Sequence, residues 1–217
     1  MANTINDILI RKFRPEDKES VRKISYKTSF LDNPHAFLDD EELVVDALTL
    51  YFMDYEAESC FVAVFQGNVI GYLIGAKSDV CMNRILLSRI YPHLLMKALR
   101  KGMFFRLKSL QCLIHFLISF LRGEFFTPNF SKEFPAVLHI NIDKNFRGER
   151  IGHKLMEHYL EYLKENKVVG VRASTVSELA KNFFVQVGFE ILFQSERSYM
   201  RYRLGKDVPL YILGRRI

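Results

Sequence analysis

The sequence has no tryptophan, only three cysteines among 217 residues, and no repeat or low-complexity stretch. Cys60, Cys81 and Cys112 lie far apart and in no metal-ligand spacing, so neither a disulfide framework nor a zinc site is expected. The first thirteen residues lack a basic segment followed by an apolar one of signal-peptide length. We therefore expect a protein of the reducing cytoplasm.

Long blocks of one charge sign are also missing. The chain carries a net charge of +6, and its basic residues are spread over four short segments with no base-stacking motif between them. Nucleic acid is therefore not an expected partner, whereas a polyanionic cofactor fits the charge. A hydrophobic fraction of 49% suffices for a sizeable core, and we expect a single domain over residues 1–217.

The first 76 residues show strand-like alternation and helical spacing in turn. A strand is predicted over 8–13, followed by a helix that starts at Arg14-Pro15-Glu16-Asp17, because proline and acidic residues suit a first helical turn. Helical spacing then predicts a second helix over 39–56. Two β-rich runs, 60–65 and 69–76, are separated by Gln66-Gly67-Asn68 and predict an antiparallel hairpin.

Residues 78–134 differ in character and are expected to form a helical insertion packed on the main sheet. Two apolar, basic helices are predicted, over about 83–99 and 103–121. The run 109–121 is hydrophobic almost all round, but its 13 residues are too few to span a bilayer. A buried helix is the preferred interpretation, a helix lying on a membrane surface is the alternative, and a membrane partner is not expected.

The last third of the chain alternates strands and helices again. Strands are predicted over 137–143, 168–173, 189–194 and 209–215, and helices over 152–166 and 176–187, with Gly188 as a C-terminal cap. The resulting order of elements predicts an α/β (α+β) fold. Its core is a mixed, mostly antiparallel sheet of about seven strands, with helices on both faces and the helical insertion after the third strand.

The segment 143–153 lies between a predicted strand and a predicted helix. A turn that opens a helix leaves several backbone N–H groups unpaired, and with the helix dipole they form a site for a pyrophosphate. Gly148 permits unusual dihedral angles, and Gly152 lets a ligand approach the backbone closely. The same turn gathers positive potential from Arg147, Arg150, His153 and Lys154.

This arrangement resembles the GNAT acetyltransferase superfamily. Arg147-Gly-Glu-Arg-Ile-Gly152 matches the first and last positions of that family's Arg/Gln-x-x-Gly-x-Gly/Ala motif. Similar likenesses are found at 10–17, at the hairpin end 69–72, and at 180–189, which resembles the family's Ala-x-x-Phe-Tyr-x-x-x-Gly-Phe. Residues 211–215 also look like the acetyltransferase-like domain attached to O-GlcNAc hydrolases. The likeness extends over nearly the whole chain except 78–134.

The resemblance implies acetyl-CoA as cosubstrate and an amine, on a small molecule or a protein, as acceptor. A homodimer is common in the family. The strand residues Ile140, Asn141 and Ile142 would lie along the pantetheine arm, with the backbones of Ile140 and Ile142 pairing with it. On the next helix, Ser177 and Phe184 fall at the family's cofactor-side positions. The pyrophosphate would be held by Arg147, Gly148, Glu149, Arg150, Ile151, Gly152 and His153.

Three positions depart from the family pattern. Arg150 replaces the first motif glycine, Ser177 replaces a common asparagine, and Phe184 stands where many members have a tyrosine that protonates the departing thiolate. A phenyl ring cannot donate a proton. These departures affect turnover more than cofactor binding by the backbone. The leading hypothesis is therefore an N-acetyltransferase, and the alternative is a catalytically weak acyl-CoA-binding module or interaction domain.

The general base and acid are less well marked. His139 lies on the strand beside the expected thioester and has an unperturbed pKa near 6.5, so it is the candidate base. A histidine in an apolar strand is, however, more often a hydrogen-bonded core residue. Tyr199 and Tyr202 could replace the lost acid, but as β-sheet aromatics they are expected to pack. His153 and His158 are five residues apart and do not share a helix face, so no metal is expected.

Overall fold

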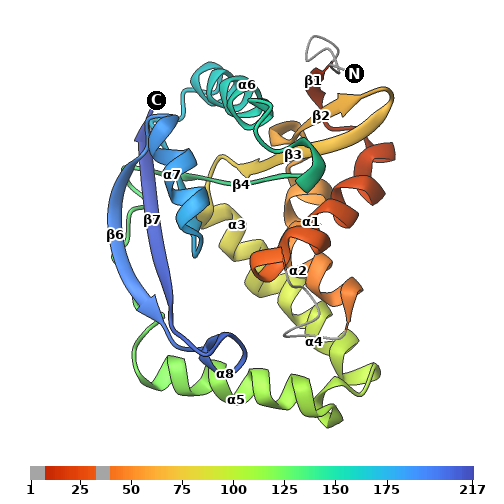
Figure 1. Cartoon of the computed structure of the whole chain (residues 1–217), viewed down its shortest axis with the longest axis vertical. Coiled ribbons are helices and arrows are strands. Elements are labelled where there is room, and N and C mark those ends of the chain that lie inside the picture. Colours follow the sequence, from red (N-terminus) through yellow and green to blue (C-terminus); the bar gives the residue numbers. More distant parts are fainter. Residues whose placement is uncertain (1–7, 33–39) are drawn as a thin grey trace.

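Seven strands form one twisted sheet in the computed structural model, which describes residues 8–32 and 40–217 (Figure 1). Their order across the sheet is β1-β2-β3-β4-β5-β7-β6, and the one parallel pair among these strands is β4 with β5. The expected mixed, mostly antiparallel sheet is therefore confirmed. The strands are β1 (Leu9–Lys12), β2 (Phe61–Phe65), β3 (Asn68–Ala76), β4 (Ala136–Ile142), β5 (Gly170–Thr175), β6 (Glu190–Arg197) and β7 (Val208–Arg216).

Helices cover both faces of the sheet, as predicted. On one face α1 packs over the β3 side chains Tyr72 and Ile74, and on the other α6 packs over Leu73 and Leu138, because neighbouring strand residues point to opposite faces. The helices are α1 (Lys18–Asp32), α2 (Glu41–Tyr55), α3 (Asp79–Ile85), α4 (Tyr91–Arg100), α5 (Leu107–Leu121), α6 (Ile151–Glu165), α7 (Glu178–Gln186) and α8 (Arg201–Leu204).

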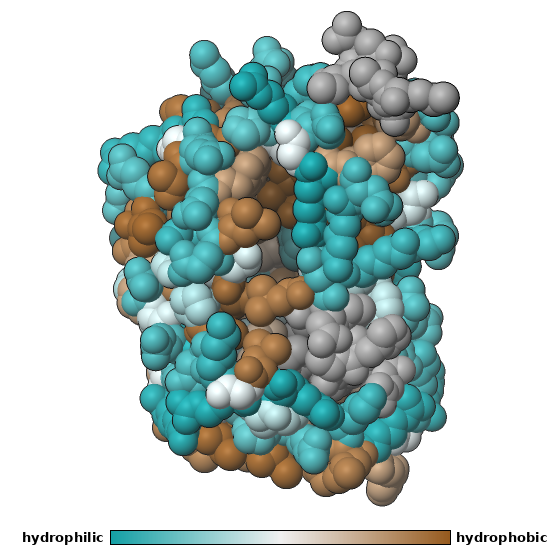
Figure 2. All heavy atoms as spheres, viewed as in Figure 1, coloured by the Kyte–Doolittle hydropathy of each residue, from teal (hydrophilic) through white to brown (hydrophobic). Residues whose placement is uncertain are grey.

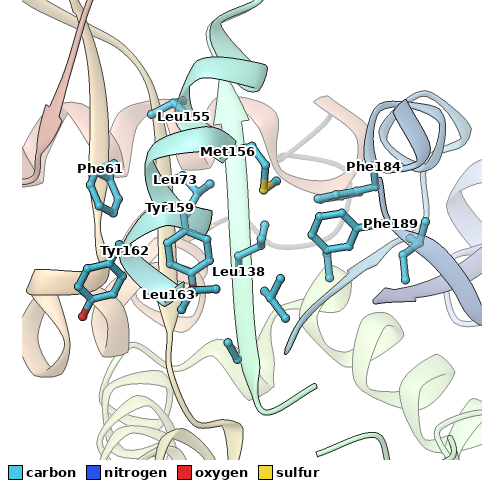
Figure 3. Packing of buried hydrophobic residues seen from close by; sticks show 14 of the residues in the cluster. Phe61, Leu73, Leu138, Leu155, Met156, Tyr159, Tyr162, Leu163, Phe184 and Phe189 are labelled. Carbon is cyan, nitrogen blue, oxygen red and sulfur yellow. The ribbon is translucent and has the colours of Figure 1, made fainter. Parts of the chain in front are cut away.

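The main hydrophobic core lies between the sheet and α6 (Figure 3). Leu155, Tyr159 and Leu163 are four residues apart on one face of α6, and all three are fully buried. The Tyr159 hydroxyl donates to the backbone oxygen of Val137 at 3.1 Å. Gly75 on β3 leaves the space in which the Tyr159 ring lies, so α6 approaches the sheet closely at this point.

The sheet splits between its two parallel strands. Strands β4 and β5 pair only at Ala136 with Val171 and at Val137 with Arg172, after which they diverge. Strand β3 remains paired with β4 from Gly71, opposite Ile142, to Ala76, opposite Val137. The edge of β4 from Leu138 onward therefore has no strand partner on its β5 side.

Most element boundaries agree with the sequence prediction to within two or three residues. The hairpin turn is shorter than expected, because Asn68 already belongs to β3 and only Gln66 and Gly67 form the turn, both at positive φ. Gly188 has a φ of +85° and caps α7 as predicted. The first residue predicted for the second helix, Asp39, lies outside the described residues, as do residues 1–7, on which the signal-peptide argument rests.

The insertion contains a longer and more irregular helical stretch than predicted. Helix α3 continues through one π-helical turn, Leu86–Ile90, into α4, where Pro92 occupies the first turn. Proline lacks an N–H and its ring clashes with the carbonyl four residues before it, which accounts for the irregular turn. A short 3₁₀ turn, Met103–Phe105, then leads into α5. Whether the whole chain is a single domain remains a prediction.

The expectation that 109–121 forms a buried helix is wrong. In α5 only Cys112 and Ser119 are buried, while Leu113, Leu117 and Phe120 are each at least half exposed. The helix runs along one end of the molecule, and none of the described helices and strands lies on its outer side (Figure 1). Among the described helices, none combines the length and the apolar composition that crossing a membrane requires.

The close approach of α6 to the sheet predicts that Gly75→Ala destabilises the protein. A Cβ at this position would lie 2.6 Å from Cε2 of Tyr159, whose ring is fully buried and cannot move outward. We expect the free energy of unfolding, measured by urea denaturation, to fall by about 1–3 kcal/mol. Adding Tyr159→Leu should restore part of that loss, since the smaller side chain frees the space; strictly additive losses would contradict this explanation.

Candidate active site

The free edge of β4 offers backbone hydrogen-bonding groups at alternate residues. The amide of Asp143 donates to Ile70 of β3 at 2.9 Å, so Asp143 and every second residue before it point toward β3. Ile140 and Ile142, which lie between them, therefore direct their N–H and C=O groups toward the side where β5 has diverged. An extended ligand could continue the sheet along this edge.

The edge of β4 leads directly into the turn that opens α6. Asp143 begins a short 3₁₀ turn, Lys144–Phe146, and Gly148 and Arg150 follow at φ values of +94° and +54°. Lys154 donates its amide to the carbonyl of Arg150, which is the first hydrogen bond into the helix. The amides of the preceding first turn, at 151–153, therefore have no acceptor within the helix, which is the arrangement that suits an anion at a helix N-terminus.

Arg147 is held away from this turn. Its guanidinium makes two hydrogen bonds of 3.0 Å with the carboxylate of Asp32 at the end of α1, and its Nε lies 3.3 Å from the carbonyl oxygen of Ile142. Burial alone would raise the pKa of Asp32, but the bonds and charge of Arg147, together with Lys144, hold it below its usual value. The positive charge at the turn itself thus comes from Arg150 and the helix dipole.

Helix α7 faces the same opening from its other side. The Phe183 ring packs against Gly152, where an added Cβ would lie 2.9 Å from the ring, and it meets the His153 ring edge to face at 5.5 Å. Ser177 caps α7 by accepting the amide of Ala180 at 3.4 Å. Phe184 is only 4% exposed and packs on Phe189 in the main core (Figure 3).

A small polar cluster lies on the face of β4 that points away from α6. The Asn141 side chain donates to the hydroxyl of Tyr72 at 2.8 Å, and the His139 ring lies 6.3 Å from the Tyr72 ring. Burial raises the pKa of Tyr72 to about 12 and lowers the pKa of His139 to about 4. At neutral pH His139 is therefore uncharged, because burial disfavours its protonated form.

A cavity of about 550 Å³ lies on the α1 side of the turn. It is lined mainly by α1, from Lys23 to Thr28, and by Asp143, Lys144 and Asn145. The space-filling view shows a hollow near the centre of the face drawn, in the region where β4 lies in Figure 1 (Figure 2).

Tyr199 and Tyr202 do not belong to the sheet as expected. Tyr199 follows β6 and packs on Phe116 at 4.6 Å, and Tyr202 lies in α8 and stacks on His115 at 4.2 Å. Both rings therefore contact α5. Their packing role was predicted correctly, but on the wrong element.

Three site residues escaped sequence reasoning. Phe183 had a signal, since it is the first aromatic of the matched family motif. Tyr72 lies in a predicted strand, but its contact with Asn141 follows from the strand register alone. Asp32 is 115 residues from Arg147 and no local pattern connects the two.

Within the described ranges no three His, Cys, Asp or Glu side chains gather as a metal site would need, and the expectation of no metal stays a prediction.

The burial of neutral His139 predicts a pH-dependent loss of stability. The unfolded chain takes up a proton near pH 6.5, whereas the folded chain does so near pH 4, so stability is present above pH 6.5 and falls as the pH drops through that window. We measure the free energy of unfolding of both chains by urea denaturation at pH 7 and at pH 4. We expect the decrease between the two pH values to be about 2–3 kcal/mol smaller for His139→Gln than for the parent chain. Parallel pH profiles for the two chains would refute this.

Comparison with known proteins agrees with this geometry. The family model described as "Acetyltransferase (GNAT) family" matches residues 18–189. A search of curated protein sequences finds no match. Among solved structures, one described as SsHAT aligns with 97% of this chain and 98% of its own at 22% identity and a TM-score of 0.71.

Two further structures share the fold at lower identity. A polyamine N-acetyltransferase from Drosophila melanogaster aligns with 97% of this chain and 100% of its own, at 12% identity and a TM-score of 0.58. A ribosomal-protein-alanine N-acetyltransferase from Brucella melitensis aligns with 96% and 99%, at 16% identity and a TM-score of 0.55. Since the family match spans the split sheet and the turn described above, the chain belongs to the acetyltransferase (GNAT) family and is thereby an N-acetyltransferase.

Proposed function

We propose that the chain transfers the acetyl group of acetyl-CoA to a primary amine by direct attack of the amine. The observation that carries this proposal is the continuity between the free edge of β4 and the anion-binding turn at the start of α6. An extended arm that ends in a diphosphate matches both parts at once. Acetyl-CoA, when bound, supplies the activated acetyl thioester.

The chain's contribution to binding is mostly backbone. Ile140 and Ile142 offer their N–H and C=O groups to the pantetheine arm, and the amides of residues 148–153 receive the diphosphate. Gly152 and His153 form the floor of this turn with the Phe183 ring behind them. Such binding tolerates Arg150 and Ser177, because neither position needs a particular side chain to present its amide.

The reaction forms one N–C bond and breaks one C–S bond. The attacking amine must lose a proton, and we assign its acceptance to His139, on the face of β4 opposite α6. Burial keeps this ring uncharged at neutral pH and also makes it a weaker base than a solvent-exposed histidine. Holding the two reactants side by side supplies much of the acceleration. The departing thiolate takes its proton from solvent, since Phe184 carries no proton to give and is buried in the core.

The acceptor is proposed as a primary amine of a small molecule or a protein chain. Two proteins with this fold are named for acceptors of both kinds. One is a polyamine N-acetyltransferase, with a small-molecule acceptor, and the other is a ribosomal-protein-alanine N-acetyltransferase, with a protein acceptor. The cavity on the α1 side of the turn has the volume for a small-molecule segment.

A second candidate function is a catalytically weak acyl-CoA-binding module. Two observations favour it. Phe184 cannot act as the general acid that protonates the thiolate, and the guanidinium of Arg147 is hydrogen-bonded to Asp32 and not directed at the turn. The two functions differ in turnover. An N-acetyltransferase releases free thiol from acetyl-CoA only when a suitable amine is present, whereas a binding module binds acetyl-CoA and releases no thiol with any amine of a broad panel.

The diphosphate site predicts a charge-reversal effect at Arg150. This residue is exposed at a φ of +54°, so Arg150→Glu places a carboxylate beside the turn without disturbing the core. We expect the Kd for acetyl-CoA, measured by calorimetric titration, to rise at least about tenfold, equivalent to about 1.4 kcal/mol.

Lys167→Glu is the matched control. Lys167 is also exposed and also has a positive φ, +56°, but it lies beyond the opposite end of α6. The charge change and the backbone conformation are therefore the same, and the Kd is expected to stay within about twofold of that of the parent chain. Equal weakening by both variants, or by neither, would remove the turn from the proposed site.

A further inference from the structure

Helix α5 is amphipathic in the opposite sense to an ordinary surface helix. Its inner side carries Ser109, Cys112, His115 and Ser119, which are buried or half-buried, while its outer side is apolar. The exposed fractions of the outer side chains range from 37% to 76%, for Leu107, Leu110, Leu113, Ile114, Leu117, Ile118, Phe120 and Leu121.

The polar inner side is fixed by specific contacts. The His115 ring stacks on Tyr202 of α8 at 4.2 Å, Ser119 donates to the Glu124 carboxylate, and Gln111 accepts from Arg203 at 3.4 Å. These contacts determine which face of α5 points inward. The apolar face therefore points outward because of defined contacts in the folded chain, and not because the helix is loosely packed.

The apolar surface continues beyond α5. Helix α4 exposes one stripe at Tyr91, Leu95 and Leu99, each about half exposed, and the turn between the two helices carries Phe105, which is 94% exposed. Figure 2 shows brown side chains along the lower edge of the molecule, where α5 lies in Figure 1. Contiguous exposed apolar surface of this kind marks an interaction site.

The segment 80–122, which contains α4 and α5, accounts for the net positive charge of the chain. Residues 80–122 contain eight Lys and Arg and no Asp or Glu, whereas the remainder has 23 Lys and Arg against 25 Asp and Glu. Lys97 and Lys101 are paired with carboxylates of the 40–46 segment, but Arg100 and Arg106 are exposed on either side of the Phe105 turn. An anionic partner is therefore indicated.

We propose that the outer faces of α4 and α5, with the Phe105 turn between them, dock the protein onto the surface of a bilayer that carries anionic lipids. Leu, Ile and Phe side chains would enter the boundary between headgroups and acyl chains, and the flanking arginines would contact the headgroups. A second copy of this chain fits less well, because a symmetric contact would bring one basic surface against another that carries no Asp or Glu of residues 80–122 to pair with it. This docking proposal does not depend on the acetyl-transfer proposal.

The absence of tryptophan gives a clean reporter for the test. Leu117→Trp places one on the outer face of α5, and Val169→Trp places one at an exposed position far from α5, beside the C-terminus. With phosphatidylcholine vesicles containing phosphatidylserine, we expect the emission of Leu117→Trp to shift to the blue and that of Val169→Trp to stay unchanged. Vesicles of phosphatidylcholine alone should bind at least about tenfold more weakly.

Two further variants test the charges and the apolar face. Adding Arg100→Glu and Arg106→Glu to the reporter chain should weaken binding to the anionic vesicles at least about tenfold. Leu113→Gln with Leu117→Gln, followed by vesicle sedimentation, should abolish binding while the thermal unfolding midpoint is retained, since both side chains are exposed.

Three outcomes would overturn the proposal. They are no blue shift for Leu117→Trp with anionic vesicles, equal binding to neutral and anionic vesicles, and a stable dimer in light scattering that Leu113→Gln with Leu117→Gln dissociates. The last would assign the surface to a second copy. None of these measurements uses acetyl-CoA, so they succeed or fail independently of the proposed enzymatic site.

Discussion

The divergence of β4 from β5 is the constraint on which the rest of the site depends. The strands are held together only at their first residues, where Arg172 donates to the buried carboxylate of Asp79 at 2.6 Å and to the carbonyl oxygen of Phe134 at 3.1 Å. Breaking a buried ion pair by removing one partner typically costs about 3–5 kcal/mol, so this point is firmly fixed. Beyond it β4 pairs with no described strand on this side, and the side chain of Arg147 reaches only the carbonyl oxygen of Ile142, at 3.3 Å. The helical insertion begins at Asp79, so the same residue anchors both the split and the insertion.

The two faces of β4 have separate roles because the side chains of a strand alternate. Leu138 and Ile140 belong to the core beneath α6, whereas His139 and Asn141 face Tyr72 and α1. The backbone edge lies between the two faces. In the proposed function, a thioester along this edge would be reached from the α1 side, where His139 lies, while the α6 side provides the packed support and the helix dipole. One strand would then separate cofactor binding from acceptor access.

Local patterns predicted the sheet and the turn because each depends on neighbours in the sequence. The period-two alternation of 137–143 and the position of Gly148 before a helix are visible without a structure, and so is the cap at Gly188. The split between β4 and β5 is not visible in any local pattern, since it depends on the register between strands joined through α6. Only the family resemblance implies that the strand diverges from its neighbour beside Ile140 and Ile142. The pairing of Arg147 with Asp32 is equally invisible, because the two residues are far apart in sequence and an arginine at such a turn is expected to face the phosphate.

Helix α5 shows why composition alone could not give the orientation of the insertion. A run that is hydrophobic almost all round predicts burial, because burial removes the most apolar area from water. In this chain the few polar residues of the run, Gln111, His115 and Ser119, find partners in α8 and at Glu124, and each of these contacts turns the same face inward. Buried polar groups that lack a partner are costly, so satisfying them decides the rotation of the helix, and the apolar residues are left outside. The position of the partners, which lie about 5 to 90 residues away along the chain, is what the sequence does not show.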